Sequence, residues 1–139
     1  MQRIIIDTNV LVSGLIQQSF PYLILNDLFI ERKIELCISD ELIKEYFDFM
    51  HRKKFSKYPE FHLKAKLVLA DIETKAMKFV PKTKVKIIND ESDNKLLELA
   101  DENKAKFIIT GNTNDFIMQA YKRTKIVSPK EYWENHRPK

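Results

Sequence analysis

The chain has 139 residues, is 44% hydrophobic, and carries a formal net charge of +4 from 24 Lys and Arg against 20 Asp and Glu. This length and apolar content predict one compact domain over residues 1–139 with a three-layer core. No stretch approaches the ~18 apolar residues of a membrane span, and the N-terminus lacks the pattern of a signal peptide, so we expect a cytoplasmic protein without a membrane anchor. A single Cys37 predicts a small buried side chain and no internal disulfide.

The first third of the chain begins with a strongly apolar segment. Residues 3–6 contain three consecutive isoleucines, which is typical of a strand buried on both faces, and this strand should end at Asp7. Pro21 is well placed to start a helix that continues to about Glu31. A second strand is expected over residues 36–38.

The middle of the chain predicts two helices. Ser39 can cap the first, which should reach about His51. After a basic and aromatic connector over residues 52–59, a second helix is expected from Phe61 to about Ala76. We expect its apolar positions to include the following residues: Leu63, Leu67 and Ala70. A short extended piece over residues 78–80 should follow.

The last third predicts two more strands and three helical segments. An apolar segment over residues 85–88 leads into a helix that reaches about Asn103, and a strand over 107–110 breaks at Gly111. A short helical piece is expected over 116–120 and a final strand at 126–127. Ser128-Pro129-Lys130-Glu131 has the pattern of a capping box and predicts a C-terminal helix. Alternating strands and helices imply a central parallel sheet covered on both faces, a three-layer α/β/α sandwich.

Oxygen-bearing side chains gather where the predicted strands end. In an open α/β sheet, ligands bind outside the carboxyl ends of the strands. Four separate regions deliver candidates to that edge: Asp7, Thr8 and Asn9; Glu45; Asp93; and Thr110, Asn112 and Asp115. We therefore expect a site at this edge.

Structural explanations compete with the functional one for each acid. Asp7 could belong to a simple turn after the strand, and Asp93 could stabilise a helix dipole. Glu45, however, borders the apolar stripe of its helix, which predicts that it faces a cleft, and the spacing of Asp93 to Leu96 and Leu97 places it on an inward face. Asp90 can act as the helix cap and is at most a supporting residue.

Clustered carboxylates favour a bound cation. Neighbouring acids raise one another's pKa, and a divalent cation removes this repulsion. Oxygen ligands point to Mg²⁺ or Mn²⁺ over zinc, and the three histidines show no ligand spacing: His51, His62 and His136. Such an ion activates water and stabilises phosphoryl charge, as phosphodiester hydrolysis requires.

Basic residues suggest a nucleic-acid surface. They fall in three groups: Arg52, Lys53, Lys54 and Lys57; Lys82, Lys84 and Lys86; and Lys122, Arg123 and Lys125. Ordinary solvated surface explains any one group equally well, whereas together they could contact phosphates. Among nearby aromatic residues we expect Tyr46 and Phe47 in the core and the connector from Phe55 to Tyr58 exposed to RNA.

The order of these motifs resembles the PIN-domain family over nearly the whole chain. The segments that carry the likeness are residues 4–11 (IIIDTNVL), 39–46, 90–100, 109–116 (ITGNTNDF) and 126–132. The branch that this chain most resembles contains bacterial toxin components of toxin-antitoxin systems. The resemblance implies a parallel sheet flanked by helices and a metal-dependent nuclease activity.

The resemblance also implies a set of roles. Asp7, Glu45 and Asp93 would be metal ligands, with Asp7 and Asp93 the principal ones. The fourth position departs from the pattern of many relatives, because Asn112 stands where they carry Asp, and Asp115 follows three residues later. Glu45 and Asp115 would then act partly through water. The supporting residues would be Thr8, Asn9, Asp90, Thr110 and Asn112.

Three functions compete at this point. The first is a Mg²⁺- or Mn²⁺-dependent endoribonuclease acting as the toxin of a toxin-antitoxin pair, with RNA as substrate, and the resemblance adds an antitoxin partner and a homodimer. The second is a non-catalytic RNA- or protein-binding module, which the substitution at Asn112 favours. The third is a phosphoacceptor receiver domain, which needs an adjacent acidic pair where the chain has Asp7 followed by Thr8 and Asn9.

Overall fold

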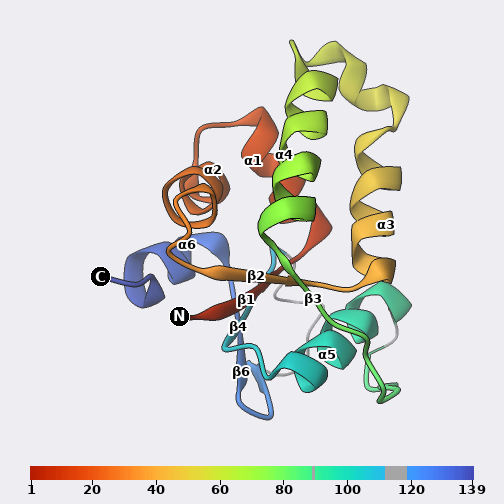
Figure 1. The fold of residues 1–139 in the computed structure, drawn as a ribbon, viewed down its shortest axis with the longest axis vertical. Coiled ribbons are helices and arrows are strands. Elements are labelled where there is room, and N and C mark those ends of the chain that lie inside the picture. The colour runs from red at the N-terminus through yellow and green to blue at the C-terminus, as the bar shows by residue number, and fades with distance from the viewer. Residues whose placement is uncertain (89, 112–118) are drawn as a thin grey trace.

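The computed structural model describes residues 1–88, 90–111 and 119–139 (Figure 1). Within this part of the chain, strands form a sheet in the order β3-β2-β1-β4-β6-β5. Their bounds are β1 (Arg3–Ile6), β2 (Glu35–Ile38), β3 (Met77–Lys78), β4 (Phe107–Ile109), β5 (Ala120–Tyr121) and β6 (Thr124–Val127). All neighbouring strands pair in parallel except β5, which pairs antiparallel with β6. The predicted parallel sheet is confirmed, and the antiparallel edge strand is an addition to it.

Helices cover both faces of this sheet. They are α1 (Thr8–Ile16), α2 (Phe20–Leu23), the π-helix η1 (Ile24–Ile30), α3 (Asp40–Met50), the 3₁₀-helix η2 (Lys53–Lys57), α4 (Phe61–Lys75), α5 (Glu91–Asn103), α6 (Pro129–Glu131) and the π-helix η4 (Tyr132–His136). In Figure 1, α1, α3 and α4 stand together on one side of the sheet and α5 lies on the other. This is the predicted α/β/α arrangement. None of the helices in the described part of the chain is long and apolar enough to cross a membrane.

The path of the chain explains the two layers. The sheet grows outward from β1 to β2 and β3, and then the chain returns past β1 to form β4 on its other side. Right-handed crossovers in opposite directions place their helices on opposite faces. The strand order therefore reverses between β1 and β4, and the carboxyl ends of these two strands form the switch point at which α/β proteins bind ligands.

Strand β1 lies inside the sheet, between β2 and β4, and its apolar residues belong to the core. Its three isoleucines have no exposed surface, and Ile5 pairs with Ile108 of β4 while Ile4 pairs with Leu36 of β2. Burial of each such side chain contributes roughly 1.5–3 kcal/mol to folding. The end of β1 is consequently held rigidly from both sides, which fixes the position of Asp7.

Both predicted helix caps are present. The Ser39 hydroxyl accepts a hydrogen bond from the Leu42 backbone N–H at 3.1 Å, and Ser128 does the same for Glu131 at 3.1 Å.

Two predictions at helices were wrong or incomplete. Ala120, expected in a helix, begins β5, while residues 116–118 lie outside the described residues. Helix α1 was not predicted.

The buried face of α4 also differs from the prediction. Leu63 and Leu67 are 55% and 58% exposed, whereas the buried positions of this helix are Phe61, Ala65, Val68, Leu69 and Ile72. Apolar residues occur all around α4, so the spacing alone allowed more than one stripe. Packing against α1, α3 and η2 selects the stripe that begins at Phe61.

Candidate active site

Asp7 stands at the switch point between β1 and β4. Its backbone N–H donates to the Ile109 carbonyl at 2.9 Å, and its Oδ2 accepts a hydrogen bond from the Thr110 hydroxyl at 2.7 Å. Only 7% of Asp7 is exposed, and Thr110 is fully buried. The ends of β1 and β4 thus fix the Asp7 carboxylate in a defined orientation, and Thr110 makes the kind of contact expected of a supporting residue.

The surroundings of Asp7 oppose its ionisation. Burial is the largest cause and raises the pKa of the Asp7 carboxyl above its usual value of 3.8, and the negative charges of Glu45 and Asp90 raise it further. Hydrogen bonds from the Thr110 hydroxyl and the Thr8 backbone lower it in part. The ionised form of Asp7 is therefore disfavoured by burial and by neighbouring negative charges. A cation bound next to Asp7 would stabilise this form.

Helix α3 brings Glu45 to the same edge. The Thr8 hydroxyl at the start of α1 donates a hydrogen bond to Glu45 Oε2, and the next residue, Tyr46, donates from its hydroxyl to the carbonyl of Ile6. Tyr46 is fully buried, as predicted, and Glu45 is half-buried. Two consecutive side chains therefore join α3 to the end of β1, and the polar one lines a cleft.

Asp93 lies on the inward side of α5. It is 6% exposed and precedes the buried residues Leu96 and Leu97, in agreement with the predicted facing. Asp90 is exposed, and its backbone carbonyl accepts from the N–H of Asn94 at 3.2 Å, which places it at the beginning of the helix. Asn9 is exposed as well.

Two buried polar residues of α5 were not anticipated as part of this region. Asn94 Oδ1 accepts from the N–H groups of Ile87 and Ile88, at 3.2 and 2.9 Å, and its amide donates to the Ile88 carbonyl at 2.6 Å. Glu98 accepts from the N–H of Val85 at 3.0 Å. These hydrogen bonds hold residues 85–88 against α5, and this segment is not part of the sheet. Polar residues inside the apolar stripe of α5 were the available signal.

Three acids of the predicted metal-ligand set lie within the described residues. No group of three His, Cys, Asp or Glu side chains is placed to hold a metal within residues 1–88, 90–111 and 119–139. Asn112 and Asp115, the predicted fourth position, lie outside the described residues. Asp7, Glu45 and Asp93 supply only oxygen donors, and two of the three are buried, so the donor chemistry fits Mg²⁺ or Mn²⁺.

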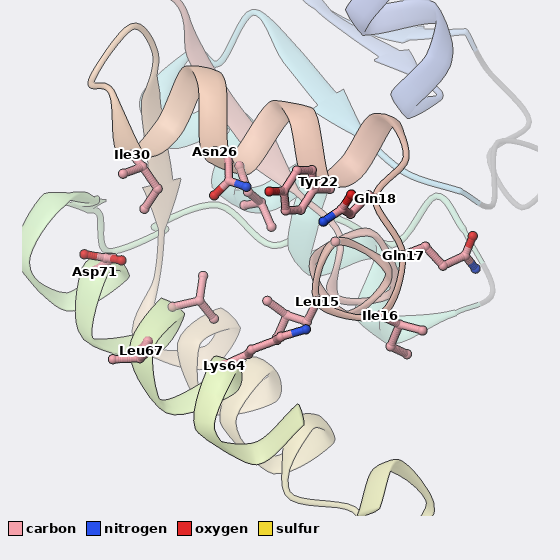
Figure 2. Close-up of a pocket in the computed structure, with 13 residues that line it drawn as sticks. Leu15, Ile16, Gln17, Gln18, Tyr22, Asn26, Ile30, Lys64, Leu67 and Asp71 are labelled. Carbon is pink, nitrogen blue, oxygen red and sulfur yellow. The ribbon is translucent and has the colours of Figure 1, made fainter. Parts of the chain in front are cut away.

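Among the described residues, two hollows next to the helices contrast with each other. A cleft of about 460 Å³ runs between α3 and α5, with Glu45 in its wall. A groove of about 270 Å³ lies between α1, the α2–η1 segment and α4. Figure 2 shows Leu15 of α1 between Lys64 on α4 and Tyr22 on the opposite wall of this groove.

The exposure of two aromatic residues is the reverse of the prediction. Phe47 is 52% exposed, whereas Phe55, expected on the surface, is 6% exposed. Phe55 stacks on Phe61 with ring centroids 4.7 Å apart, so η2 turns its aromatic side chain inward against α4. Phe47 instead stacks on His51 along the outside of α3. The aromatic surface therefore belongs to α3.

Comparison with known proteins agrees with this geometry. A model of the PIN domain matches residues 3–114, a range that includes β1, α3, α5 and β4. The chain belongs to the PIN-domain family. PIN domains are generally nucleases and typically use divalent metals, so this chain has a nuclease fold.

A second comparison covers more of the chain. The chain is 31% identical over 141 residues to the uncharacterized protein MJ1680 of Methanocaldococcus jannaschii, covering 95% of this chain and 90% of that protein. The match to the family model confirms the predicted PIN resemblance. Membership of the toxin branch stays a prediction, since this relative has no described activity.

Proposed function

We propose that this PIN domain is a Mg²⁺- or Mn²⁺-dependent endoribonuclease that hydrolyses RNA phosphodiester bonds, and that it acts as the toxin of a toxin-antitoxin pair. One observation carries the enzymatic part. The Asp7 carboxyl is buried at the switch point, held by Thr110, and its pKa is raised by burial and by the charges of Glu45 and Asp90. This arrangement is unfavourable for folding alone and suits a site that binds a cation.

Each predicted residue has a proposed role. Asp7 and Asp93 would be the principal ligands, while Glu45 and Asp115 would act partly through water. The supporting residues would be Thr8, Asn9, Asp90, Thr110 and Asn112. A bound divalent cation would supply water activation and stabilisation of phosphoryl charge.

The chain's own residues prepare the site. Thr110 donates to Oδ2 of Asp7, and the Thr8 backbone also hydrogen-bonds to this carboxyl, so both residues orient it at the end of β1. Thr8 holds Glu45 at the same edge. Supporting contacts of this kind orient metal ligands and strongly affect activity in metalloenzymes.

Substitution of the principal acids tests the proposal. Asp7→Asn and Asp93→Asn should each abolish metal-dependent cleavage of a fluorescent single-stranded RNA, with a fall of at least roughly 10²–10³-fold. Asp71→Asn is a matched control, because Asp71 lines the other groove and pairs with Lys75 at 3.4 Å. Wild-type cleavage should stop in EDTA and return with Mg²⁺ or Mn²⁺.

Metal binding provides a readout that does not depend on activity. Calorimetric titration of the wild type with Mn²⁺ should give a binding isotherm that Asp7→Asn removes, while Asp71→Asn keeps it. Cleavage by Asp7→Asn at the wild-type rate, after exclusion of contaminating nuclease, would show that the site assignment is wrong.

A non-catalytic RNA- or protein-binding module is the second candidate. It is favoured by Asn112, which stands where many relatives carry an acid. Under this alternative the wild type would bind RNA without binding Mn²⁺ near neutral pH. The same titration therefore separates the two functions.

The partners follow from the resemblance and stay proposals. As a toxin, the protein would be held inactive by a small antitoxin and would form a homodimer. Expression of the wild type without its partner should arrest growth, whereas Asp7→Asn should not. Sedimentation of the purified chain measures the dimer directly, and normal growth with active wild-type enzyme present would remove the toxin assignment while leaving the nuclease assignment.

A further inference from the structure

The cleft between α3 and α5 continues from the acidic site along α3. Three residues of this cleft follow one side of α3. Phe49 lies four residues after Glu45 on the helix, and Arg52 lies three residues after Phe49, just beyond the end of the helix. Lys95 and Leu96 of α5 form the opposite wall. A ligand that fills the cleft would therefore lie between Glu45 at one end and Arg52 at the other.

Arg52 is a positive charge held in a fixed place. Its guanidinium carbon lies 4.3 Å from the centroid of the Phe49 ring, a distance at which the ring attracts and orients the cation. Its side chain is exposed, and within the described part of the chain it makes no ion pair. The charge is thus oriented by the ring and available to an anion.

The other cations of the cleft already have partners. Lys95 of α5 pairs with Glu41 of α3 at 3.4 Å, which links the two walls near the start of α3, and Lys44 pairs with Asp48 at 3.8 Å. These pairs are at least half exposed, so each contributes little to stability. With these two pairs set aside, the cleft has a negative charge at Glu45 and a positive charge at Arg52.

Building on the proposed nuclease function, we propose that this cleft binds single-stranded RNA and that Arg52, oriented by Phe49, contacts its phosphate backbone. Phe49 follows Glu45 by about 6 Å along α3, and Arg52 lies just beyond the end of this helix. A strand with one phosphate at the acidic edge would carry a neighbouring phosphate past Arg52. A cleft of about 460 Å³ has the size of a small-ligand site and accommodates one unpaired nucleotide of a strand, whereas a duplex is contacted across its wide minor groove.

A binding measurement without metal tests this proposal apart from cleavage. Fluorescence anisotropy of a fluorescein-labelled oligouridylate would be recorded in EDTA for the wild type, Arg52→Ala and Arg137→Ala. Arg137, which directly follows η4, is the matched control, because it is also exposed and its guanidinium carbon lies 4.1 Å from the Trp133 ring centroid. We expect Arg52→Ala to weaken binding roughly fivefold or more and to reduce the salt dependence by about one phosphate contact, a slope change of about 0.7.

The control should bind within about twofold of the wild type, and Arg52→Lys should retain most of the binding because it keeps the charge. Circular dichroism melts verify that each variant folds. Equal effects of Arg52→Ala and Arg137→Ala, or no binding of the oligouridylate by the wild type, would contradict the proposal that this cleft binds RNA. Binding of an RNA duplex of the same length as tightly as the single strand would overturn the single-stranded assignment.

Cleavage in Mg²⁺ is measured separately on the same proteins. A wild type that binds RNA through Arg52 yet never cuts it would support the cleft and remove the proposed nuclease function. If the wild type cuts RNA while Arg52→Ala binds it normally, the proposed role of the cleft is wrong and the proposed nuclease function stands. The two proposals therefore fail in distinguishable ways.

Discussion

The α3–α5 cleft and the α1–η1–α4 groove have opposite chemistry. Most side chains of the cleft are charged: Glu41, Lys44, Glu45, Asp48, Arg52 and Lys95. The groove has mainly apolar walls, with residues such as Leu15, Ile16, Ile30 and Leu67, and its charged groups are Lys64 and Asp71 (Figure 2). An apolar hollow is the usual first choice for a ligand site, yet Glu45, which is hydrogen-bonded to Thr8 next to Asp7, lines the charged one.

The difference follows from the position of each hollow relative to the sheet. The cleft meets the sheet edge through Glu45, whose partner Thr8 directly follows Asp7 at the end of β1. The groove lies between helices of one layer. Strand ends at a switch point can place fixed polar groups in a cleft, because the backbone of the core holds them. Shape alone is a weaker guide to function in this fold.

The largest effect that separates the two hollows is expected at Glu45. Glu45→Gln and Thr8→Val each remove the hydrogen-bonded carboxylate arrangement at the sheet edge, and each should lower metal-dependent RNA cleavage roughly 10–100-fold. Asp48→Asn is the control within the same cleft, since Asp48 is exposed and pairs only weakly with Lys44. Initial rates on a fluorescent RNA give the comparison. Equal losses for Glu45→Gln and Asp48→Asn would mean that the general charge of the cleft matters and the placement of Glu45 does not.

A smaller effect is expected on the stability of the protein without metal. Asp7→Asn should raise the melting temperature in EDTA at neutral pH by a few degrees, because it removes a buried charge whose pKa is raised by burial and by Glu45 and Asp90. Asn can still accept the hydrogen bond from Thr110. Differential scanning calorimetry measures the change, and added Mn²⁺ should stabilise the wild type and not the variant.

The pH dependence of this gain has a defined sign. The folded pKa of Asp7 lies above the unfolded value of 3.8, so the folded state binds more protons and the wild type loses stability as pH rises through this interval. The advantage of Asp7→Asn should be complete above the folded pKa and should disappear as pH falls towards 3.8. An advantage that persists below that value would show that ionisation of Asp7 is not its cause.

Local sequence signals predicted much of the fold. The isoleucine run of β1 and the caps at Ser39 and Ser128 depend on burial or on hydrogen bonds within a few residues, and all three are present. Cys37 is buried as expected, and burial raises the pKa of its thiol to about 12. Asp93 faces inward and Glu45 lines a cleft, because helical spacing fixes the side of a helix on which a residue lies.

Helix α1 could not be predicted in the same way. Its sequence, TNVLVSGLI, contains Thr, Val, Ser and Gly, which are weak helix formers. The helix depends on packing instead. A Cβ on Gly14 would lie 2.6 Å from Leu25 Cδ1 and 3.3 Å from the backbone of Pro21, so this glycine allows α1 to approach the α2–η1 segment closely. Contacts between segments decide this helix, and a single sequence does not display them.

The same reason explains the aromatic residues and the last position of the site. Phe55 is buried because η2 brings it onto Phe61, a contact between different elements. Phe47 is left outside because Tyr46 takes the inward position of α3. The roles of Asn112 and Asp115 stay predictions, since both lie outside the described residues.

The smallest effect is expected in the apolar groove, at Leu67. Leu67→Ser replaces a side chain that is 58% exposed, so it should change stability by no more than about 0.5 kcal/mol. Ile72→Ser on the same helix is the matched buried variant; Ile72 has no exposed surface, and its loss should cost about 2–5 kcal/mol. Urea unfolding of both variants tests the observed face of α4, and RNA cleavage by Leu67→Ser should stay within about twofold of the wild type. A larger fall in cleavage with unchanged stability would place the groove on the path of the RNA, and the contrast between the two hollows would then no longer hold.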